Sequence, residues 1–475
     1  DGENTSIRDH VARLHTFYYI DVSNQGNTLR ARPASYKYFH EMAVRNDPEF
    51  EYVWSPGGIL LTGSAQDVVE LFLNRCNDED FWGDELIFRR CESSYETSFS
   101  NESVDSTTLA NNGVGNLAHY NNSVAFPGCE PDFPYSNGWL GGDATLSIPI
   151  SRTQNLWIFS DTWVGMENQR IREGARMVGN TIAISTCDEE RGWHIEYFWR
   201  DMYTENPKPF FESHTHRYKY WPREAFEFQG DLYVALSKVG AKPGAPPDDI
   251  FSFSHIGSSL AKISNFRTAL PDEWIIDLIP WSSFIESDNW SFLAKHENHL
   301  YIFYRIAMVG TFLVRLPLTE LTNPREHMEY LAADMTWRYG FDQDRARVVM
   351  REGISGGGSL NYHEDLHQWV AVYGPRFLDD KIFTLTAPDI VGPWSEELAI
   401  YSTPELTPGN AGFDKSYFCY AAREHIQFYD EETKRLLVTY DCNSSEMSTL
   451  LSNMTIYRPR VVLIPAVDSG LPSGD

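Results

Sequence analysis

The chain has 475 residues, of which 14% are aromatic, and a formal net charge of −28 at pH 7. Nucleic acids and anionic membrane surfaces are bound mainly through Lys and Arg, so this charge argues against both as partners. No run of about 18 apolar residues occurs, and no transmembrane helix is expected. The length is sufficient for one large core and an additional small domain.

Residues 1–130 contain no repeat, and we expect them to form an N-terminal α/β extension or small domain of unknown role. Phe17–Ile20 predicts a strand, and the apolar spacing within Ala65–Arg75 predicts an amphipathic helix. Residues 92–122 are rich in Ser, Thr and Asn, which is typical of an exposed loop or linker. The second predicted domain spans residues 131–470.

Five copies of one hydrophobic strand follow at a nearly constant spacing. They begin at residues 156, 232, 300, 369 and 436, so successive copies lie 67 to 76 positions apart. Each copy follows a strand and a polar turn, as in a β-hairpin. A sandwich of hairpins would not keep such a period, so we predict an all-β fold, a five-bladed β-propeller. The predicted hairpins pair Ala144–Ile150 with Leu156–Asp161, Ala225–Phe228 with Leu232–Leu236, Ser291–Ala294 with Leu300–Arg305, Ser359–Tyr362 with Trp369–Tyr373, and Tyr417–Ala422 with Leu436–Asp441.

Cysteines and glycosylation sequons favour a secreted, extracellular protein over a cytosolic one with incidental sequons. Six cysteines allow three disulfides, and Cys419 and Cys442 are expected to pair because they flank one predicted hairpin. Six Asn-x-Ser/Thr sequons suggest a glycoprotein of an oxidising compartment. At Asn289 and Asn443 a glycan would block the pocket ends of the strands. Glycans are expected instead at Asn4, Asn101 or Asn121.

Two aspartates stand at the open end of the first hairpin. Asp143 follows two glycines and precedes the inner strand, while Asp161 ends the returning strand, so antiparallel pairing brings them together. Cross-strand neighbours lie about 5–8 Å apart, and paired carboxylates suit a glycosidase, retaining when close and inverting when farther apart. The structural alternative is that both form Asx turns or caps. Because no further oxygen ligands cluster in the sequence, we expect no metal and no cofactor.

Other polar and aromatic residues are expected at the same mouth of the propeller. Aromatic, guanidinium and carboxylate groups around one pocket are typical of a sugar-binding site, and the glycines Gly356–Gly358 would let a ligand approach the backbone. The candidates for contact with substrate are Trp221, Glu224, Trp290, Arg305, Tyr362, Tyr420 and His425.

Several of these segments resemble one known family. The five-bladed propeller family that includes the endo-D-arabinanases of glycoside hydrolase family 183 has motifs similar to Gly141-Gly-Asp143, Phe159-Ser-Asp161-Thr-Trp163, Tyr220-Trp-Pro222 and Val438-Thr-Tyr-Asp-Cys-Asn-Ser444. The resemblance spans about residues 136–465. It implies that Asp143 and Asp161 are the catalytic carboxylates. Ser160 stands where the family more often has Gly, and residues 1–130 are foreign to its bacterial enzymes. The resemblance therefore supports cleavage of furanosides or related glycans more than it supports D-arabinan as the substrate.

Three functions are open on the sequence alone, and all take a poly- or oligosaccharide as partner. The first is a secreted glycoside hydrolase in which Asp143 and Asp161 divide the roles of general acid and of nucleophile or base. The second is a polysaccharide lyase with His425 or Tyr420 as base and Arg305 neutralising a uronate. The third is a glycan-binding protein without activity. The sequence does not predict the oligomeric state.

Overall fold

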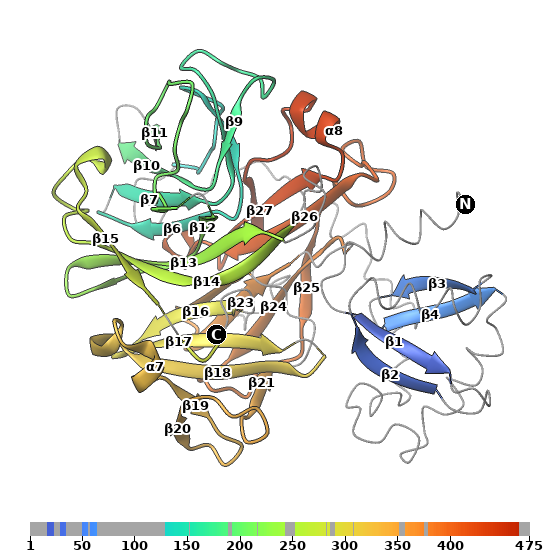
Figure 1. Ribbon diagram of the computed structural model, residues 1–475. Helices are drawn as coiled ribbons and strands as arrows, with labels where there is room; N and C mark the ends of the chain where they lie inside the picture. Colours follow the sequence, from blue (N-terminus) through green and yellow to red (C-terminus); the bar gives the residue numbers. More distant parts are fainter. Residues whose placement is uncertain are drawn as a thin grey trace. The chain divides into compact units, whose positions relative to one another are not determined.

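The computed structural model describes residues 129–464 and four strands nearer the N-terminus (Figure 1). Gaps in this range fall at residues 152, 189–191, 216, 243–251, 282, 286–289, 307, 351–356 and 375–378. The chain divides into two compact units, Asp1–Val104 with Ala307–Val309, and Asp105–Ile306 with Gly310–Asp475.

The first unit contains two antiparallel hairpins. Strand β1 (Phe17–Val22) pairs with β2 (Leu29–Ala34), and β3 (Phe50–Ser55) pairs with β4 (Gly58–Gly63). The predicted strand at Phe17–Ile20 is confirmed as part of β1. The predicted helix at Ala65–Arg75, Cys76, Cys91, and the asparagines favoured for glycosylation lie outside the described residues.

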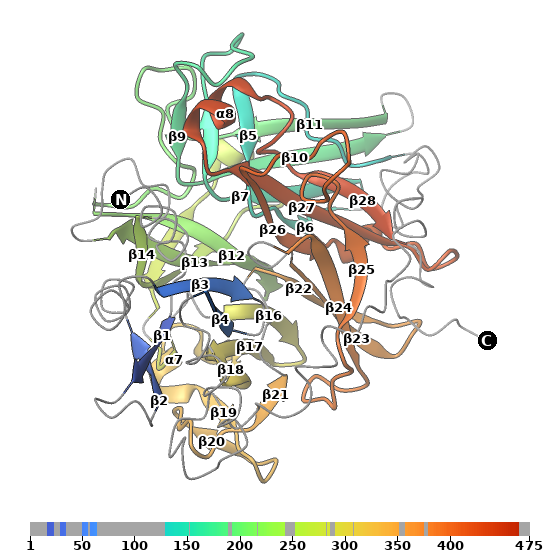
Figure 2. The same ribbon diagram turned by 90° about the vertical axis from the view of Figure 1, so that its right-hand side faces the viewer.

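The second unit is the predicted five-bladed β-propeller (Figures 1 and 2). Every one of the five predicted second strands is confirmed, and each pairs with an inner strand. The connection is a short turn in blades one to four, whereas in blade five it runs from residue 425 to 435 and contains a 3-10 helix. The inner and second strands are β6 (Leu146–Pro149) and β7 (Gln154–Phe159), β12 (Tyr218–Phe228) and β13 (Asp231–Ala241), β16 (Trp290–His296) and β17 (His299–Ile306), β22 (Ser359–His363) and β23 (Gln368–Tyr373), and β26 (Tyr417–Glu424) and β27 (Leu436–Ser444).

Further strands extend each blade outward by antiparallel pairing. They are β10 (Thr181–Asp188) and β11 (Gly192–Phe198) in blade one, β14 (Phe253–Ile263) and β15 (Ile276–Pro280) in blade two, β18 (Gly310–Pro317), β19 (Glu329–Leu331), β20 (Trp337–Tyr339) and β21 (Val348–Met350) in blade three, β24 (Lys381–Ala387) and β25 (Leu398–Ser402) in blade four, and β28 (Arg460–Ile464) in blade five.

The turn chemistry explains the hairpins locally. In blade two, Gln229 and Gly230 both have positive φ, at 53° and 85°, as the tight type I′ turn requires. The second strands are nearly continuous apolar runs because they are covered on both faces by neighbouring blades. In β7, for example, Leu156–Phe159 is fully buried.

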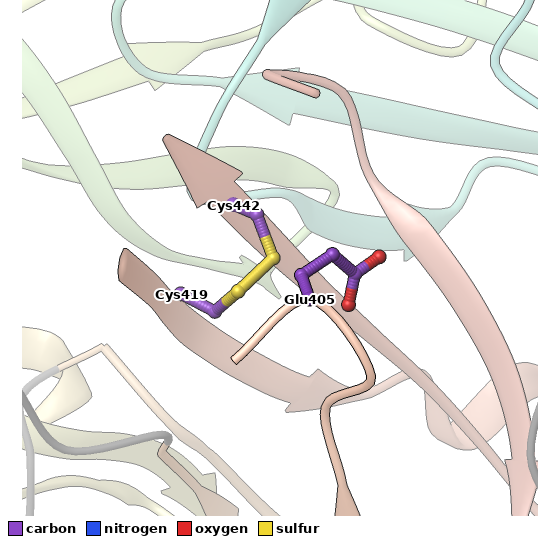
Figure 3. Close-up of side chains that lie close together, drawn as sticks. All are labelled: Glu405, Cys419 and Cys442. Carbon is purple, nitrogen blue, oxygen red and sulfur yellow. A yellow bond between two sulfur atoms is a disulfide. The ribbon is translucent and has the colours of Figure 1, made fainter. Parts of the chain in front are cut away.

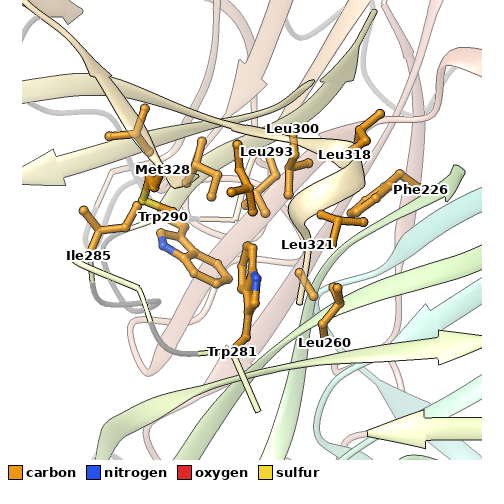
Figure 4. Close-up of a cluster of buried hydrophobic side chains, with 14 of the residues drawn as sticks. Phe226, Leu260, Trp281, Ile285, Trp290, Leu293, Leu300, Leu318, Leu321 and Met328 are labelled. Carbon is orange, nitrogen blue, oxygen red and sulfur yellow. The ribbon is translucent and has the colours of Figure 1, made fainter. Parts of the chain in front are cut away.

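Hydrophobic contacts join each blade to the next, and this closes the ring. The core between blades two and three contains Trp281 and Trp290, with ring centroids 5.2 Å apart (Figure 4). Blade five packs against blade one through Phe428 and Trp157, whose rings stack at 5.6 Å. Blades one and two, three and four, and four and five share equivalent apolar clusters.

Two disulfides fasten the propeller. Cys419 and Cys442 face each other across β26 and β27 and are bonded, which confirms the predicted pair. Cys129 is bonded to Cys187, which links the segment before blade one to β10. No helix within the described residues is long and apolar enough to cross a membrane.

A small sheet and a short helix complete blade one at its junction with blade five. The sheet consists of β5 (Trp139–Gly142), β8 (Thr162–Val164) and β9 (Arg176–Val178). Helix α8 (Met447–Ser452) lies beside it (Figure 2), and Leu450 packs against residues of β5 and β8. This junction carries the candidate site.

Candidate active site

The structure brings Asp143 and Asp161 together as antiparallel pairing predicts. Asp143 lies between β5 and β6, and Asp161 lies between β7 and β8. The amide of Asp143 donates to the carbonyl of Asp161 at 3.3 Å, and the amide of Ser160 donates to the carbonyl of Asp143 at 2.7 Å. The two carboxylates are therefore attached to directly hydrogen-bonded pieces of backbone.

The two glycines before Asp143 allow close packing around it. Gly141 has φ of +114°, and a Cβ there would lie 2.0 Å from the carbonyl oxygen of Tyr457. A Cβ on Gly142 would lie 2.7 Å from the Thr162 hydroxyl. Any larger residue at Gly141 would push away the segment that carries Tyr457, so this glycine is required for the site rather than for a turn alone.

Two tyrosines hold one oxygen of Asp143. The Tyr420 hydroxyl donates to Asp143 Oδ2 at 2.6 Å. The Tyr457 hydroxyl lies 3.4 Å from the same oxygen and 3.2 Å from the Asp161 carbonyl, so it is shared between the two aspartates. Burial raises the pKa of both tyrosines well above the usual value, which keeps them protonated as donors.

Asp143 has the properties of an acid that is protonated near neutral pH. Burial, and then repulsion from Asp161, raise the pKa of Asp143 to about 7, against the hydrogen bond from Tyr420 and the positive charge of Lys219. Its second oxygen, Oδ1, is buried and accepts no hydrogen bond. An environment of this kind is what a general acid needs.

Asp161 has a contrasting environment, in which a cation and an indole N–H contact its carboxylate. Its Oδ2 lies 2.5 Å from Lys219 Nζ, and its Oδ1 accepts a hydrogen bond from Trp221 Nε1 at 2.9 Å. Lys219 also lies over the Trp221 ring, 5.3 Å from its centroid. Lys219 was not predicted. A signal existed, because residues two apart on a strand share a face and Trp221 was a candidate.

A third carboxylate, Asp441, lies next to the pair; the sequence places it at the matching end of blade five but assigns it no role. Its Oδ2 accepts a hydrogen bond from the amide of Ala144 at 2.9 Å. Burial and repulsion from Asp143 raise the pKa of Asp441 well above its ordinary value. Ala144 has φ of 52°, a conformation that is strained for alanine. Asp441 therefore helps to hold the strained backbone next to Asp143. The repeat contained the signal, since Asp441 and Asp161 occupy the same place in their copies.

A buried arginine fixes the segment that supplies Tyr457. The Arg172 side chain is completely buried and donates to the carbonyls of Leu140 at 2.9 Å, Leu450 at 2.8 Å and Ile456 at 2.5 Å. It joins β5 to the chain after β27. Burial lowers the pKa of Arg172, and its partners are carbonyls and the Tyr135 hydroxyl.

Two more of the predicted residues are Arg305, which lies near the carboxylate end of the axis, and Glu224, which lies near its middle. Arg305 lies half-buried near the end of β17, opposite Thr311. Glu224 lies farther along β12 and forms an ion pair with Arg423, which also donates to the carbonyl of Gly357 at 3.2 Å. Arg423 therefore ties inner-strand segments of three blades together across the axis.

Three predicted substrate contacts are not at the carboxylates. Trp290 is wrong because its side chain is 1% exposed and packs in the core between blades two and three. Tyr362 and His425 are wrong as neighbours of Asp143, because they lie at the far ends of β22 and β26 and line a different cavity. A strand of several residues spans the whole axis, so its last residues are on the opposite face from its first.

One group of potential metal ligands within the described residues includes the two sulfurs of a disulfide. A carboxylate oxygen of Glu405 and the sulfurs of Cys419 and Cys442 lie within 4.8 Å of one another (Figure 3). The sulfurs are bonded to each other, and Glu405 binds the Tyr440 hydroxyl at 3.0 Å and Arg460 at 3.1 Å. This arrangement is structural.

Comparison with known proteins gives the family but no activity. The family described as "Domain of unknown function (DUF5005)" matches residues 133–465, well over half of the chain. The chain belongs to this family. No curated protein sequence is significantly similar to this DUF5005 chain.

Solved structures support the fold of the DUF5005 propeller. A Bacteroides ovatus protein described as a candidate hydrolase is similar with a TM-score of 0.53 and 14% identity, over 69% of this chain and 86% of that one. A Cellvibrio cellulosa α-L-arabinanase has a TM-score of 0.33 and 11% identity over 68% and 91% of the two chains. An endo-arabinase from Bacteroides thetaiotaomicron has a TM-score of 0.34 and 12% identity, over 70% of this chain and 97% of that one.

Proposed function

We propose that the protein is a secreted glycoside hydrolase that cleaves furanosides or related neutral glycans, with Asp143 and Asp161 as its catalytic pair. The observation that carries the proposal is the contrast between the two carboxylates. Burial and repulsion raise the pKa of Asp143 to about 7, whereas Asp161 is ion-paired with Lys219. Carboxylates in such different environments are the usual means of obtaining an acid and a nucleophile or base at one pH.

In this mechanism Asp143 protonates the leaving oxygen of the glycosidic bond. Tyr420 and Tyr457 contact only Oδ2, so the proton is carried by Oδ1, which has no hydrogen-bond partner among the described residues. Asp161 acts as nucleophile or as base toward water. Lys219 and Trp221 orient the Asp161 carboxylate, and the indole also offers a face on which a sugar ring can pack.

The sugar class is inferred from charge and resemblance. A chain with net charge −28 disfavours an anionic polymer unless the pocket is locally basic. The motif around Asp143 and Asp161 is similar to that of the endo-D-arabinanase family, and membership in glycoside hydrolase family 183 is part of the proposal. The two disulfides fit an oxidising, extracellular compartment.

A lyase mechanism is less compatible with the geometry. The His425 ring nitrogens are both engaged, with Ser147 Oγ at 2.6 Å and Thr439 Oγ1 at 2.7 Å, and burial lowers the pKa of His425 to about 3. Burial raises the pKa of Tyr420 well above its ordinary value, so the phenolate that would have to act as base is scarcely populated near neutral pH. Neither group is suited to remove a proton from a uronate.

The test is a screen of furanoside and uronate oligosaccharides with mass-spectrometric detection of products. The wild-type protein should release shortened neutral sugars, and both Asp143→Asn and Asp161→Asn should lose at least about a thousandfold in kcat. Unsaturated products absorbing near 235 nm would identify a lyase instead. Binding without any product would identify a glycan-binding protein, and full activity in both variants would overturn the catalytic assignment.

A further inference from the structure

A cavity lies at the opposite end of the propeller axis from the carboxylates. Its volume is about 400 Å³, within the range of small-molecule sites. All five blades contribute to its wall. Representative lining residues are Ser147 from β6, Phe226 from β12, His296 from β16, Tyr362 from β22 and Gln427 after β26.

The direction of the inner strands separates this cavity from the candidate active site. On β26, Tyr420 contacts Asp143 while Glu424, four residues later, lines the cavity. A bulge lies between them, so they pair with Asp441 and Val438, three positions apart on β27, and are separated by about 10 Å along the strand. Arg423 and Glu224 form an ion pair, and both residues line the cavity on its side nearer to Asp143. The two ends of the axis are therefore distinct sites.

The wall of the cavity combines aromatic rings with buried amide and hydroxyl groups. The Trp369 ring lies 5.4 Å from Tyr362 and 5.1 Å from His296, centroid to centroid. Beside them, Asn361 donates to the buried carboxylate of Glu424 at 3.1 Å. Aromatic faces suit the C–H surface of a sugar ring, and amides can exchange hydrogen bonds with its hydroxyls.

The charge of the wall limits the ligand further. Four glutamates line the cavity against one lysine and one arginine, and the arginine is already paired with Glu224. Ionised glutamates only accept hydrogen bonds, so the fitting ligand is rich in donors and carries no negative charge. A neutral sugar unit meets these conditions, whereas a uronate or a phosphate would be repelled.

We propose that this cavity, here called the distal pocket, is a second binding site for a neutral saccharide. It would hold a glycan on the face opposite to the one where the bond is cut. The proposal shares only the sugar class with the proposed hydrolase function, and its test measures binding without turnover.

Binding is measured by calorimetric titration and saturation-transfer NMR on the full chain. The probes are neutral trisaccharides of arabinofuranose, xylopyranose and galactopyranose, with trigalacturonate and spermidine as charged counterparts. Trp221→Ala should weaken binding at the candidate active site, where this indole contacts Asp161, and we expect at least one neutral probe still to bind to this variant. Adding Tyr362→Ala should weaken that remaining affinity about tenfold. Tyr339→Ala, the same change at an exposed position of β20, should leave it unaltered.

Several outcomes would overturn the proposal that the distal pocket binds a neutral saccharide. They are no neutral probe bound by the Trp221→Ala protein, equal affinity with and without Tyr362→Ala, or preference for spermidine or trigalacturonate. If Tyr362→Ala does not fold, Glu364→Ala at the exposed rim replaces it, with an expected loss of about threefold. Failure of the hydrolase proposal is separate, since it appears as absent turnover in the wild-type protein whatever the titrations give.

Discussion

Replacing Asp143 by Asn should stabilise the folded protein at high pH while it removes turnover. The pKa of Asp143 in the folded protein, about 7, lies about 3 above the ordinary 3.8. At about 1.4 kcal/mol per pKa unit, this difference corresponds to at most about 4 kcal/mol. The free energy comes from the cost of charging a buried carboxyl beside Asp161, which an amide never incurs.

The sign of the effect depends on pH. Because the folded-state pKa is raised, the folded protein binds this proton more tightly than the unfolded chain does. The resulting stabilisation is complete below pH of about 4 and is lost as the pH rises through about 7. The wild-type protein and Asp143→Asn should therefore differ less in stability near pH 5 than near pH 9. Relative to low pH, the variant should gain up to about 4 kcal/mol over the wild-type protein near pH 9.

The assay is urea unfolding followed by tryptophan fluorescence at both pH values, with the free energy of unfolding compared at equal urea dependence. Asp272→Asn, at an exposed position, is the matched control and should show no difference between the two pH values. A stability difference for Asp143→Asn that is the same near pH 5 and pH 9 would refute the reasoning, because a raised pKa requires the two to differ.

Three further changes test the surroundings of the pair. Tyr420→Phe removes a hydrogen bond that lowers the pKa of Asp143, so the alkaline limb of kcat/KM should move to higher pH; an unmoved limb would contradict Asp143 as the acid. Arg172→Met leaves several buried carbonyls without donors and should lower the free energy of unfolding in urea by about 3–5 kcal/mol, with a smaller loss for Arg172→Lys. An unchanged urea midpoint would show that these hydrogen bonds do not stabilise the fold. Replacing Cys419 and Cys442 by Ser opens a loop with a sequence separation of 23 and should cost about 3 kcal/mol in thermal unfolding without reductant, a difference from the wild type that should disappear when reductant is added to both proteins.

The scaffold was predictable because its information is local and repeated. Each blade carries its own hairpin, so five similar strands at one spacing were sufficient to predict the propeller. The same local logic paired Asp143 with Asp161, since one hairpin brings both to one end. Cys419 and Cys442 followed for the same reason.

Contacts between distant segments were predicted less well. Tyr457 reaches Asp143 across 314 positions of sequence, and nothing near either residue indicates this. Tyr362 and His425 were assigned to the wrong face because the ends of their strands were not distinguished. Trp290 does begin its strand at the expected end, but its side chain turns into the core, and an alternating pattern alone does not fix which face is buried.

The candidate site is formed where the first and last blades meet to close the ring. Asp143 precedes the first inner strand, while Tyr420, Asp441 and Tyr457 belong to blade five or follow it. Arg172 binds the two sides of this junction to each other. The burial that raises the pKa of Asp143 therefore exists only when the first and last blades have met. The strained backbone at Ala144 requires the same contacts, because its amide is held by Asp441. An open ring would have an ordinary carboxyl at Asp143, so acidity suited to catalysis near neutral pH follows from completed folding.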